Sequence, residues 1–448
     1  MTSLIRIPLL LAATLAVIFL SSSALGASVL DAPQTYSNHK VLTVTLPSKE
    51  SAELLQELGS RVSIDEWRSP RPTSLAKMAE YSTDIMISSE DFPFVRAFLT
   101  AHRLKFTIMI EDVGSLIETQ KLESLARRAK RKASTHAYVD WEDYYRYDEI
   151  AAWVNEIVAN NSDIASVSVI GKSTEGRNLQ LVKISKPGSP ANKNAVLIDG
   201  GFHAREWISP AIVTYILNEF LGPNRKSNEE ILDLIDLYIV PIVNVDGYEY
   251  SHSSSRLWRK TRSNHGSNLG CRGVDPNRNF DFHFGGSGTS NDKCSEIYRG
   301  PNAYSEPETA ALRDVLTNKS INFKSYLTIH SYGQWWLTPW SWTYDLPEDY
   351  DDLLRFGEHG YSALRAVHGT SFLVGATTEI LGTTAGCSDD WAKAVAGIKY
   401  ANTLEVRDTG RYGFVLPANQ IIPTSEETWA GIRAVLRYDF ENDRPRSL

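Results

Sequence analysis

The sequence predicts two folded parts: a small α+β domain and a larger α/β domain. The larger one is expected to contain a mixed, mostly parallel, doubly wound sheet with helices on both faces. A chain of 448 residues is longer than one hydrophobic core usually organises. Short apolar or β-branched runs alternate with segments of helical periodicity in both parts. A basic stretch at residues 127–132 separates them and marks the boundary.

The composition and the N-terminus indicate an exported globular protein. Hydrophobic residues make up 42% and charged residues 22% of the chain, which is ordinary for a folded protein. The formal net charge of -8 argues against a nucleic-acid partner. Residues 1–26 are typical of a signal peptide, with Arg6, the apolar run Leu9–Leu20 and small residues at Ala24-Leu25-Gly26. The run is short for a membrane span, so we expect a secreted mature protein without membrane attachment.

Export makes the three cysteines interpretable, because disulfides form outside the cytosol. Cys271 and Cys294 enclose a loop rich in Gly, Asn and Ser, and we expect them to pair. Cys387 is then left over. None of the three forms a closely spaced pair, so a metal site built from them is not expected.

The first domain shows a β-α-β-α-β pattern, which is enough for a small open-sandwich α+β unit. The expected strands are Lys40–Leu46, Asp84–Ile87 and Lys105–Ile110, and the expected helices are Lys49–Leu58 and Phe92–His102. The helix-prone run Lys121–Lys132 follows and ends in a dense basic cluster. This run is either a solvated linker or a processing site, and we favour processing because proteolysis concentrates in exposed segments between folded units. The domain boundaries would then be 27–132 for a pro-segment and 133–448 for the main domain.

In the second domain, strands alternate with helices, which predicts the mostly parallel sheet. The expected strands are Ala165–Ile170, Leu179–Ile184, Ala195–Asp199, Leu237–Val243, Tyr326–Ile329 and Tyr400–Leu404. The expected helices are Asp148–Ala159, Ser209–Leu221, Glu229–Leu234, Tyr350–Val367 and Glu427–Tyr438. Ligands of such sheets bind beyond the carboxyl ends of the strands.

Four chemically capable residues follow three of these strands. His203 and Glu206 come just after Ala195–Asp199, His330 follows Tyr326–Ile329, and Glu405 follows Tyr400–Leu404. A His-x-x-Glu pair alone occurs often by chance. Two histidines and one carboxylate that meet at one sheet edge are instead typical of catalytic zinc, with Glu405 as general base for the bound water. The alternative for Glu405 is an ordinary ion pair with Arg407 or Arg411.

Longer motifs carry a resemblance to a known family. They are HARE at 203–206, RLWRKTRS at 256–263, GVDPNRNFD at 273–281, IHSYGQ at 329–334 and LEVRDTGRYGFVLPANQIIPT at 404–424. The chain resembles the zinc metallocarboxypeptidases of the pancreatic A/B type from about Tyr36 to its C-terminus, including IEDV at 110–113 ahead of the basic region. The resemblance implies a secreted proenzyme with one zinc ion, activated by a trypsin-like protease and acting on peptide or protein C-termini. We expect a monomer.

The resemblance also assigns roles to individual residues. The zinc ligands would be His203, Glu206 and His330, and the general base would be Glu405. Arg259 would stabilise the oxyanion, while Asn277 and Arg278 would bind the terminal carboxylate of the substrate, a task suited to a bidentate donor. Without the resemblance, surface ion pairs would be the simpler interpretation of these arginines. The substrate subsites would be lined by Arg205, Ser331, Tyr332 and Phe414.

The pocket residues resemble those of family members that remove C-terminal Lys or Arg. Asp389, in the sequence Ser388-Asp389-Asp390-Trp391, stands where those members have an acidic residue, and Ser341 and Gly375 also match. A buried carboxylate stabilises an incoming cation and disfavours an apolar side chain. Two alternatives are a preference for aliphatic or aromatic residues, if the pocket segment displaces Asp389, and an inactive peptide-binding homologue.

Two features depart from the family pattern. The segment Gly375–Asp389 is longer than in the family, and no Tyr occurs between Tyr361 and Tyr400. The family has a Tyr there that closes over the substrate, and Leu381 or Gly382 stands near its position. Its phenol would add a hydrogen bond to the substrate without joining the zinc chemistry. We therefore predict an active enzyme with weaker or altered substrate binding.

Overall fold

The computed structural model describes residues 34–72, 81–130, 139–190, 192–442 and 444–445. The predicted signal peptide and the last two residues of the basic cluster, Arg131 and Lys132, lie outside the described residues. Among the described helices, none is long and apolar enough to cross a membrane.

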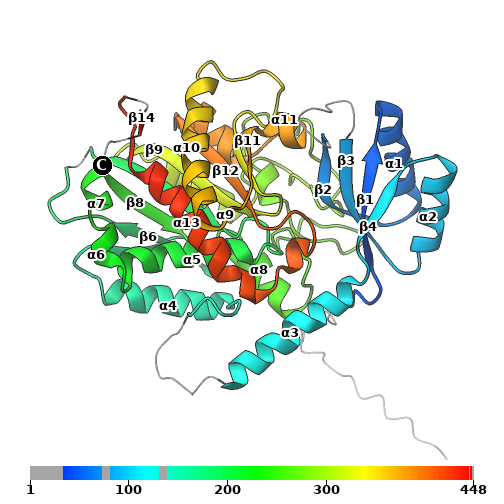
Figure 1. Cartoon of the computed structure of the whole chain (residues 1–448), viewed down its shortest axis with the longest axis horizontal. Coiled ribbons are helices and arrows are strands. Elements are labelled where there is room, and N and C mark those ends of the chain that lie inside the picture. The colour runs from blue at the N-terminus through cyan, green and yellow to red at the C-terminus, as the bar shows by residue number, and fades with distance from the viewer. Residues whose placement is uncertain (1–33, 73–80, 131–138, 191, 443, 446–448) are drawn as a thin grey trace, which may run out of the picture. The chain divides into compact units, whose positions relative to one another are not determined.

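The first domain is a four-stranded antiparallel sheet with the strand order β2-β3-β1-β4. Its elements are β1 (Lys40–Leu46), α1 (Lys49–Arg61), β2 (Ile64–Pro72), β3 (Tyr81–Ile87), α2 (Phe92–Ala101) and β4 (Phe106–Ile110). One face of β1, with Leu42 and Val44, packs against the apolar sides of α1 and α2. Both helices therefore cover the same face of the sheet, as Figure 1 shows. This is the predicted open sandwich with one additional strand.

The additional strand, β2, was not predicted because its sequence, IDEWRSPRP, is largely charged and contains two prolines. It lies at the edge of the sheet, where proline is tolerated. Trp67 of β2 packs with Val41 and Met86 on the sheet face away from the helices. The same cluster includes Tyr332 and Phe414 of the second domain. The uncovered face of the first sheet is thus buried against the second domain.

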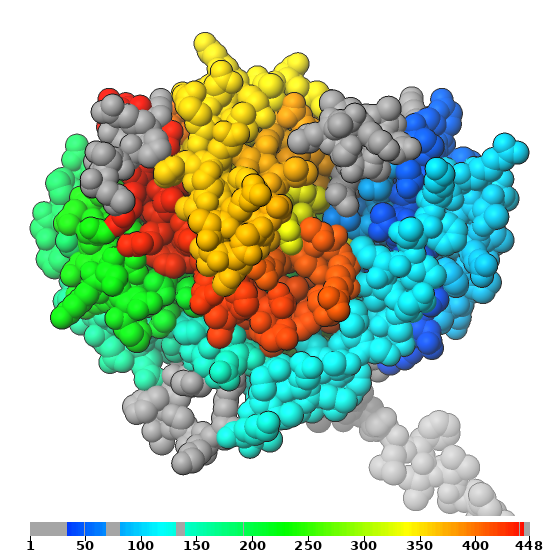
Figure 2. All heavy atoms as spheres, viewed as in Figure 1, coloured from blue at the N-terminus to red at the C-terminus, as the bar shows by residue number. Residues whose placement is uncertain are grey.

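Helix α3 (Val113–Lys130) follows β4 and begins eight residues before the predicted helical run, Lys121–Lys132. Its Gln120 side chain donates a hydrogen bond to the carbonyl oxygen of Leu416 at 3.0 Å. In Figure 2 the cyan surface of this helix accordingly lies beside an orange surface of the second domain. The basic end of α3 is attached as well, because Arg128 donates to Glu149 at 2.7 and 3.1 Å.

The second domain contains an eight-stranded sheet with the order β11-β10-β12-β9-β7-β8-β6-β5. The strands are β5 (Ala165–Lys172), β6 (Asn178–Ile184), β7 (Asn194–Gly200), β8 (Ile235–Val240), β9 (Asn322–Ser331), β10 (Trp335–Thr338), β11 (Leu373–Ala376) and β12 (Tyr400–Val406). The central strands β8, β7, β9 and β12 are parallel, as are β10 and β11. The pairs β10–β12, β8–β6 and β6–β5 are antiparallel. The predicted mixed, mostly parallel sheet is confirmed.

Helices cover both faces of this sheet, and the central strand β7 shows why. Val196 and Ile198 point into one core, and Ala195 and Leu197 point into the other. The first core is covered by α4 (Tyr147–Ala159), α5 (Ile208–Leu221), α10 (Tyr350–His368) and α13 (Ile421–Leu436). The second is covered by α9 (Pro307–Leu316) and α12 (Ser388–Trp391). An apolar run without polar alternation is the expected sequence of a strand buried on both faces.

The remaining short elements connect these layers. They are α6 (Arg225–Asn228), α7 (Ile231–Leu234), α8 (Val245–Ser253), η1 (Pro276–Arg278), α11 (Thr377–Leu381), η2 (Ala392–Ala396), η3 (Gly413–Val415), η4 (Ala418–Gln420), β13 (Tyr438–Asp439) and β14 (Arg444–Pro445). The predicted strand Leu237–Val243 ends at Val240, before Pro241, which has no N–H to donate. The last helix begins at Ile421 rather than Glu427. Cys271 and Cys294 form the expected disulfide, and Cys387 is a buried free thiol.

Candidate active site

The loop after β7 carries two of the predicted zinc ligands. Gly201 turns the chain with φ +68°, a conformation that favours glycine. Its N–H donates to Oγ of Ser209 at 2.9 Å, and the same hydroxyl donates to the carbonyl oxygen of Ile329 at 2.5 Å. Ser209 of α5 therefore joins the loop of His203 to strand β9, which carries His330. The turn and this hydroxyl bring the two ligand-bearing segments together.

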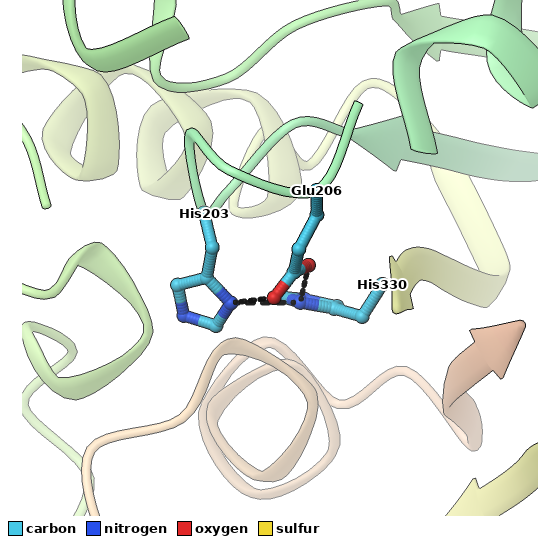
Figure 3. A group of neighbouring side chains, drawn as sticks. All are labelled: His203, Glu206 and His330. Atoms are coloured by element: carbon cyan, nitrogen blue, oxygen red, sulfur yellow. Dashed lines mark hydrogen bonds and ion pairs between the residues drawn. The ribbon is translucent and has the colours of Figure 1, made fainter. Parts of the chain in front are cut away.

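The side chains of His203, Glu206 and His330 point toward one another, as Figure 3 shows. His203 Nδ1 lies 2.8 Å from Oε1 of Glu206, and His330 Nδ1 lies 3.1 Å from its Oε2. The two Nδ1 atoms are 3.2 Å apart. All three residues are buried, and their donor atoms lie within 4.8 Å of one another. Two imidazoles and one carboxylate that converge in this way fit a zinc ion.

Glu206 and His330 stabilise each other's charged forms, whereas burial lowers the pKa of His203. Burial opposes ionisation of Glu206, but the adjacent His203 and His330 hold its pKa below the usual range. Burial likewise disfavours a charged His330, yet the Glu206 carboxylate raises the pKa of that imidazole. A cation binds the ionised carboxylate and the neutral imidazoles, so zinc binding would displace the proton that this pairing favours on His330.

Asp275, a residue that the sequence analysis did not assign, holds several site residues in place. Its Oδ1 lies 3.1 Å from His203 Nε2 and accepts a hydrogen bond from the Asn277 N–H at 2.9 Å. Its Oδ2 accepts from Arg259 at 2.8 and 3.0 Å. Burial opposes this charge, but Arg259 and Arg278 keep the Asp275 pKa well below its ordinary value. A carboxylate behind a ligating histidine fixes the ring and increases its basicity.

Glu405 lies beside the zinc ligands on β12, where the strand register pairs it with His330. The alternative ion pair with Arg407 is not formed, since Arg407 instead contacts Glu427 at 2.6 Å. Burial, followed by the neighbouring Glu206, raises the pKa of Glu405 to about 8. A raised proton affinity makes the Glu405 carboxylate a stronger base, and a bound zinc cation would favour the ionised form that accepts a proton.

Comparison with known proteins agrees with this geometry. The family described as "Zinc carboxypeptidase" matches residues 150–431, and "Carboxypeptidase activation peptide" matches residues 42–120. The chain belongs to the zinc carboxypeptidase family. It is a metallocarboxypeptidase, a zinc-dependent peptide hydrolase made with an activation peptide.

Individual relatives extend the likeness over nearly the whole chain. Carboxypeptidase B of Astacus astacus is 49% identical over 67% of this chain and 98% of its own. Carboxypeptidase B of Homo sapiens is 38% identical over 96% of this chain and 99% of its own. The crystal structure of thrombin activatable fibrinolysis inhibitor superposes with a TM-score of 0.80 at 33% identity, covering 91% of this chain and all of that one.

Two of the zinc ligands, His203 and Glu206, line one pocket of about 110 Å³ together with most of the residues expected to bind substrate. Among those expected at the pocket, its lining includes Arg259, Asn277, Arg278, Ser331, Tyr332, Ser341, Asp389, Glu405 and Phe414. Gly375 is not among the lining residues, because it lies in β11 beside Ile380. The lining also includes Leu381, which the sequence analysis placed near the family's Tyr, and Thr384, Cys387 and Thr403, which it did not identify as pocket residues.

Asp389 is buried in this pocket, while the neighbouring Asp390 has a different environment. Oδ2 of Asp389 accepts a hydrogen bond from the Thr403 hydroxyl at 2.9 Å, and burial raises the pKa of its carboxyl. The Asp390 carboxylate accepts the N–H groups of Ser341 and Trp342 at 2.8–3.0 Å. Asp390 therefore supports the backbone of the pocket, whereas Asp389 contacts a side chain within it.

The pro-segment covers the remaining predicted subsites. Arg205, which stacks on Phe414 at 4.1 Å, donates to both oxygens of Asp65 in β2 at 3.0 Å. The Tyr332 hydroxyl donates to Asp84 of β3 at 3.1 Å. Arg68 of β2 also lines the zinc pocket and lies over the Tyr332 ring at 5.2 Å. Charged side chains of the activation peptide thus contact residues that are predicted to line the substrate subsites.

Proposed function

We propose that this carboxypeptidase releases C-terminal Lys or Arg from peptides after its pro-segment is removed, and that it acts outside the cell. The observation that carries the proposal is the buried Asp389 carboxylate in the same pocket as His203, Glu206 and Glu405. A cationic side chain in this pocket would compensate that charge, whereas an apolar one would leave it buried and unpaired. The similarity to carboxypeptidase B of two organisms supports the same preference.

The proposed roles follow from the contacts of each residue. His203, Glu206 and His330 would hold the zinc ion, which supplies a polarising cation and lowers the pKa of bound water. Glu405 would accept the proton of the attacking water. Arg259, held by Asp275, would face the developing oxyanion.

The substrate's terminal carboxylate would be bound by Asn277 and Arg278. Nη1 of Arg278 donates to the carbonyl oxygen of Asn277 at 2.7 Å, and its Nε donates to Gly288 at 2.9 Å. These bonds fix the plane of the guanidinium at the pocket. Arg205, Ser331, Tyr332 and Phe414 would line the subsites for the preceding residues once the pro-segment has left. Ser341 would line the specificity pocket. Gly375 would contribute indirectly, from β11 outside the pocket lining.

A preference for aliphatic or aromatic residues remains the second candidate, because apolar Leu381 also lines the pocket. Asp389 favours the basic preference. Although the segment between Gly375 and Asp389 is long, Asp389 still shares the pocket with Glu405.

We also propose that residues 1–26 are a signal peptide, 27–132 the pro-segment and 133–448 the mature enzyme, released by a trypsin-like protease. Cleavage at Arg127-Arg128 is disfavoured, because Arg128 is paired with Glu149 and lies 3.2 Å from Asp143. A trypsin-like protease needs the arginine side chain in its own pocket. Cleavage is therefore expected within Lys130-Arg131-Lys132, and the mass of the trypsin-treated enzyme tests this.

The function is tested by trypsin activation and measurement of kcat/KM on peptides that differ only in a terminal Arg, Lys, Phe or Leu. We expect Arg and Lys to be preferred and the chelator-treated enzyme to be inactive. A preference for Phe or Leu would contradict the role of Asp389. Light scattering of the activated enzyme tests the expected monomer, and analysis of culture medium from an expressing cell line tests secretion.

A further inference from the structure

A buried hydroxyl network connects the two strands of the zinc site to the pocket helix. The Tyr326 hydroxyl of β9 lies 2.8 Å from Asp199 Oδ2 of β7 and 3.0 Å from Ser388 Oγ of α12. Asp199, Tyr326 and Ser388 are each fully buried, at 0% exposure. Tyr326 precedes His330 by four residues, and Asp199 precedes His203 by four residues. The roles assigned above leave all three network residues without a function.

Ser388 also contacts the groups proposed to recognise the substrate. Its N–H donates to Oδ1 of Asn277 at 2.9 Å, so the amide oxygen of Asn277 faces α12 and its NH2 is available for the substrate carboxylate. Asp389, the residue proposed to bind the substrate cation, follows Ser388 directly. The position of one serine thus controls both the carboxylate-binding amide and the pocket carboxylate.

α12 has only four residues, so its own hydrogen bonds hold it weakly. No side-chain cap was found at its N-terminus, where Cys387 precedes the first turn. Two side-chain contacts attach this short helix to the central sheet: Ser388 contacts Tyr326 of β9, and Asp389 contacts Thr403 of β12. Loss of the Ser388 contact would let Ser388 and Asp389 shift relative to the zinc ligands on β7 and β9.

We infer that Ser388 and Tyr326 are positioning residues that set substrate binding and basic selectivity. The inference rests on the proposed function, since it assumes that Asn277 and Asp389 contact the substrate. Neither Ser388 nor Tyr326 touches the reacting bond. Their removal should therefore affect KM and selectivity much more than kcat.

The test compares Ser388→Ala and Tyr326→Phe with Ser325→Ala in the trypsin-activated enzyme. Ser325 is the matched control, because it is also buried in β9 and its hydroxyl donates to the Tyr400 carbonyl at 2.9 Å, away from α12. For the two network variants we expect KM on an Arg-terminated peptide to rise roughly fivefold to tenfold, the scale of one buried hydrogen bond. kcat and zinc content should be retained, and the preference for Arg over Leu should fall. Ser325→Ala should leave KM and selectivity unchanged.

A double-mutant cycle with Asn277→Ala makes the test sharper. If Ser388 acts through Asn277, the combined effect on KM will be smaller than the product of the single effects, whereas Ser325→Ala and Asn277→Ala will combine independently. An unchanged KM and selectivity in both Ser388→Ala and Tyr326→Phe would overturn the inference. If Ser388→Ala does not fold, Tyr326→Phe decides alone. A wild-type enzyme without basic preference would instead refute the proposed function.

Discussion

The zinc-binding edge of the sheet and the pocket wall formed by residues 375–391 are held in different ways. At the zinc edge, charged side chains hold one another. Asp275 contacts both His203 and Arg259. Glu206 lies between the imidazoles of His203 and His330. Replacing any one of these groups leaves a buried charge without its partner, which is costly.

The middle of the pocket wall is held largely through its backbone. The N–H of Thr384 donates to the Ser341 carbonyl at 2.6 Å, and the N–H of Ala385 donates to Ser287 at 2.8 Å. Leu381 and Thr384 line the pocket with side chains that these backbone bonds do not use. The wall can therefore change its side chains without losing its anchors. The contrast between the two regions indicates that substitutions at the zinc edge abolish the chemistry. Substitutions in the pocket wall can instead change the selectivity while the fold is retained.

The largest effect is expected when a zinc ligand is changed. Glu206→Gln leaves the shape but removes the charge between the two histidines. Zinc affinity should fall by more than about 100-fold, because changing residues that only support a ligand already costs 10- to 100-fold. Elemental analysis and peptide hydrolysis measure the loss.

Glu308→Gln is a matched control for Glu206→Gln. Glu308 is also buried, and burial raises its pKa to about 8, so its carboxyl is largely protonated at pH 7 and resembles Gln. Zinc content and activity should be unchanged in this variant. Equal zinc loss in both variants would contradict the assignment of Glu206 as ligand.

The next effect concerns Glu405, which lies beside the ligands but is not one of them. In Glu405→Gln we expect kcat to fall roughly 100- to 10,000-fold, the range that general acid–base catalysis supplies, with zinc content and KM retained. Single-turnover kinetics and elemental analysis on the same sample separate these quantities. Loss of zinc along with activity would identify Glu405 as a ligand and not as the base.

The zinc edge could be predicted from the sequence because its residues follow strands. The apolar run before His203 and the runs before His330 and Glu405 identify β7, β9 and β12, and parallel strands end at one edge. Asp275 has no such signal, since it precedes a short 3₁₀ turn and reaches His203 from 72 residues away. Side-chain pairing over such distances depends on the folded loops.

The pocket wall was predictable only in part. The acidic residue Asp389 was found by resemblance, but the contributions of Leu381, Thr384 and Thr403 depend on how a longer loop folds back onto β12. The strands β10 and β11 were missed because each has only four residues, which is too short for a periodic pattern. Pocket shape is thus decided by register and loop path, which single-sequence patterns do not contain.

At the pocket wall, Asp389→Asn removes the charge and retains the shape. We expect kcat/KM for Arg-terminated peptides to fall roughly 100- to 5,000-fold, because breaking a buried ion pair costs about 3–5 kcal/mol, while Leu-terminated peptides are affected little. Asp390→Asn is the control, since Asp390 binds backbone N–H groups and should alter thermal stability without changing the Arg-to-Leu ratio. A larger change in selectivity for Asp390→Asn would mean that the two roles are reversed.

The smallest effect is expected from Leu381→Tyr, which supplies a phenol at the wall position that departs from the family. Leu381 is the last residue of α11 and lines the zinc pocket, so a hydroxyl here can reach bound substrate. We expect KM to fall about twofold to tenfold with little change in kcat, since one hydrogen bond contributes about 0.5–1.5 kcal/mol. Leu381→Phe adds the ring without the hydroxyl and should not lower KM. If both variants lower KM equally, ring packing and not hydrogen bonding is the quantity that this wall adjusts.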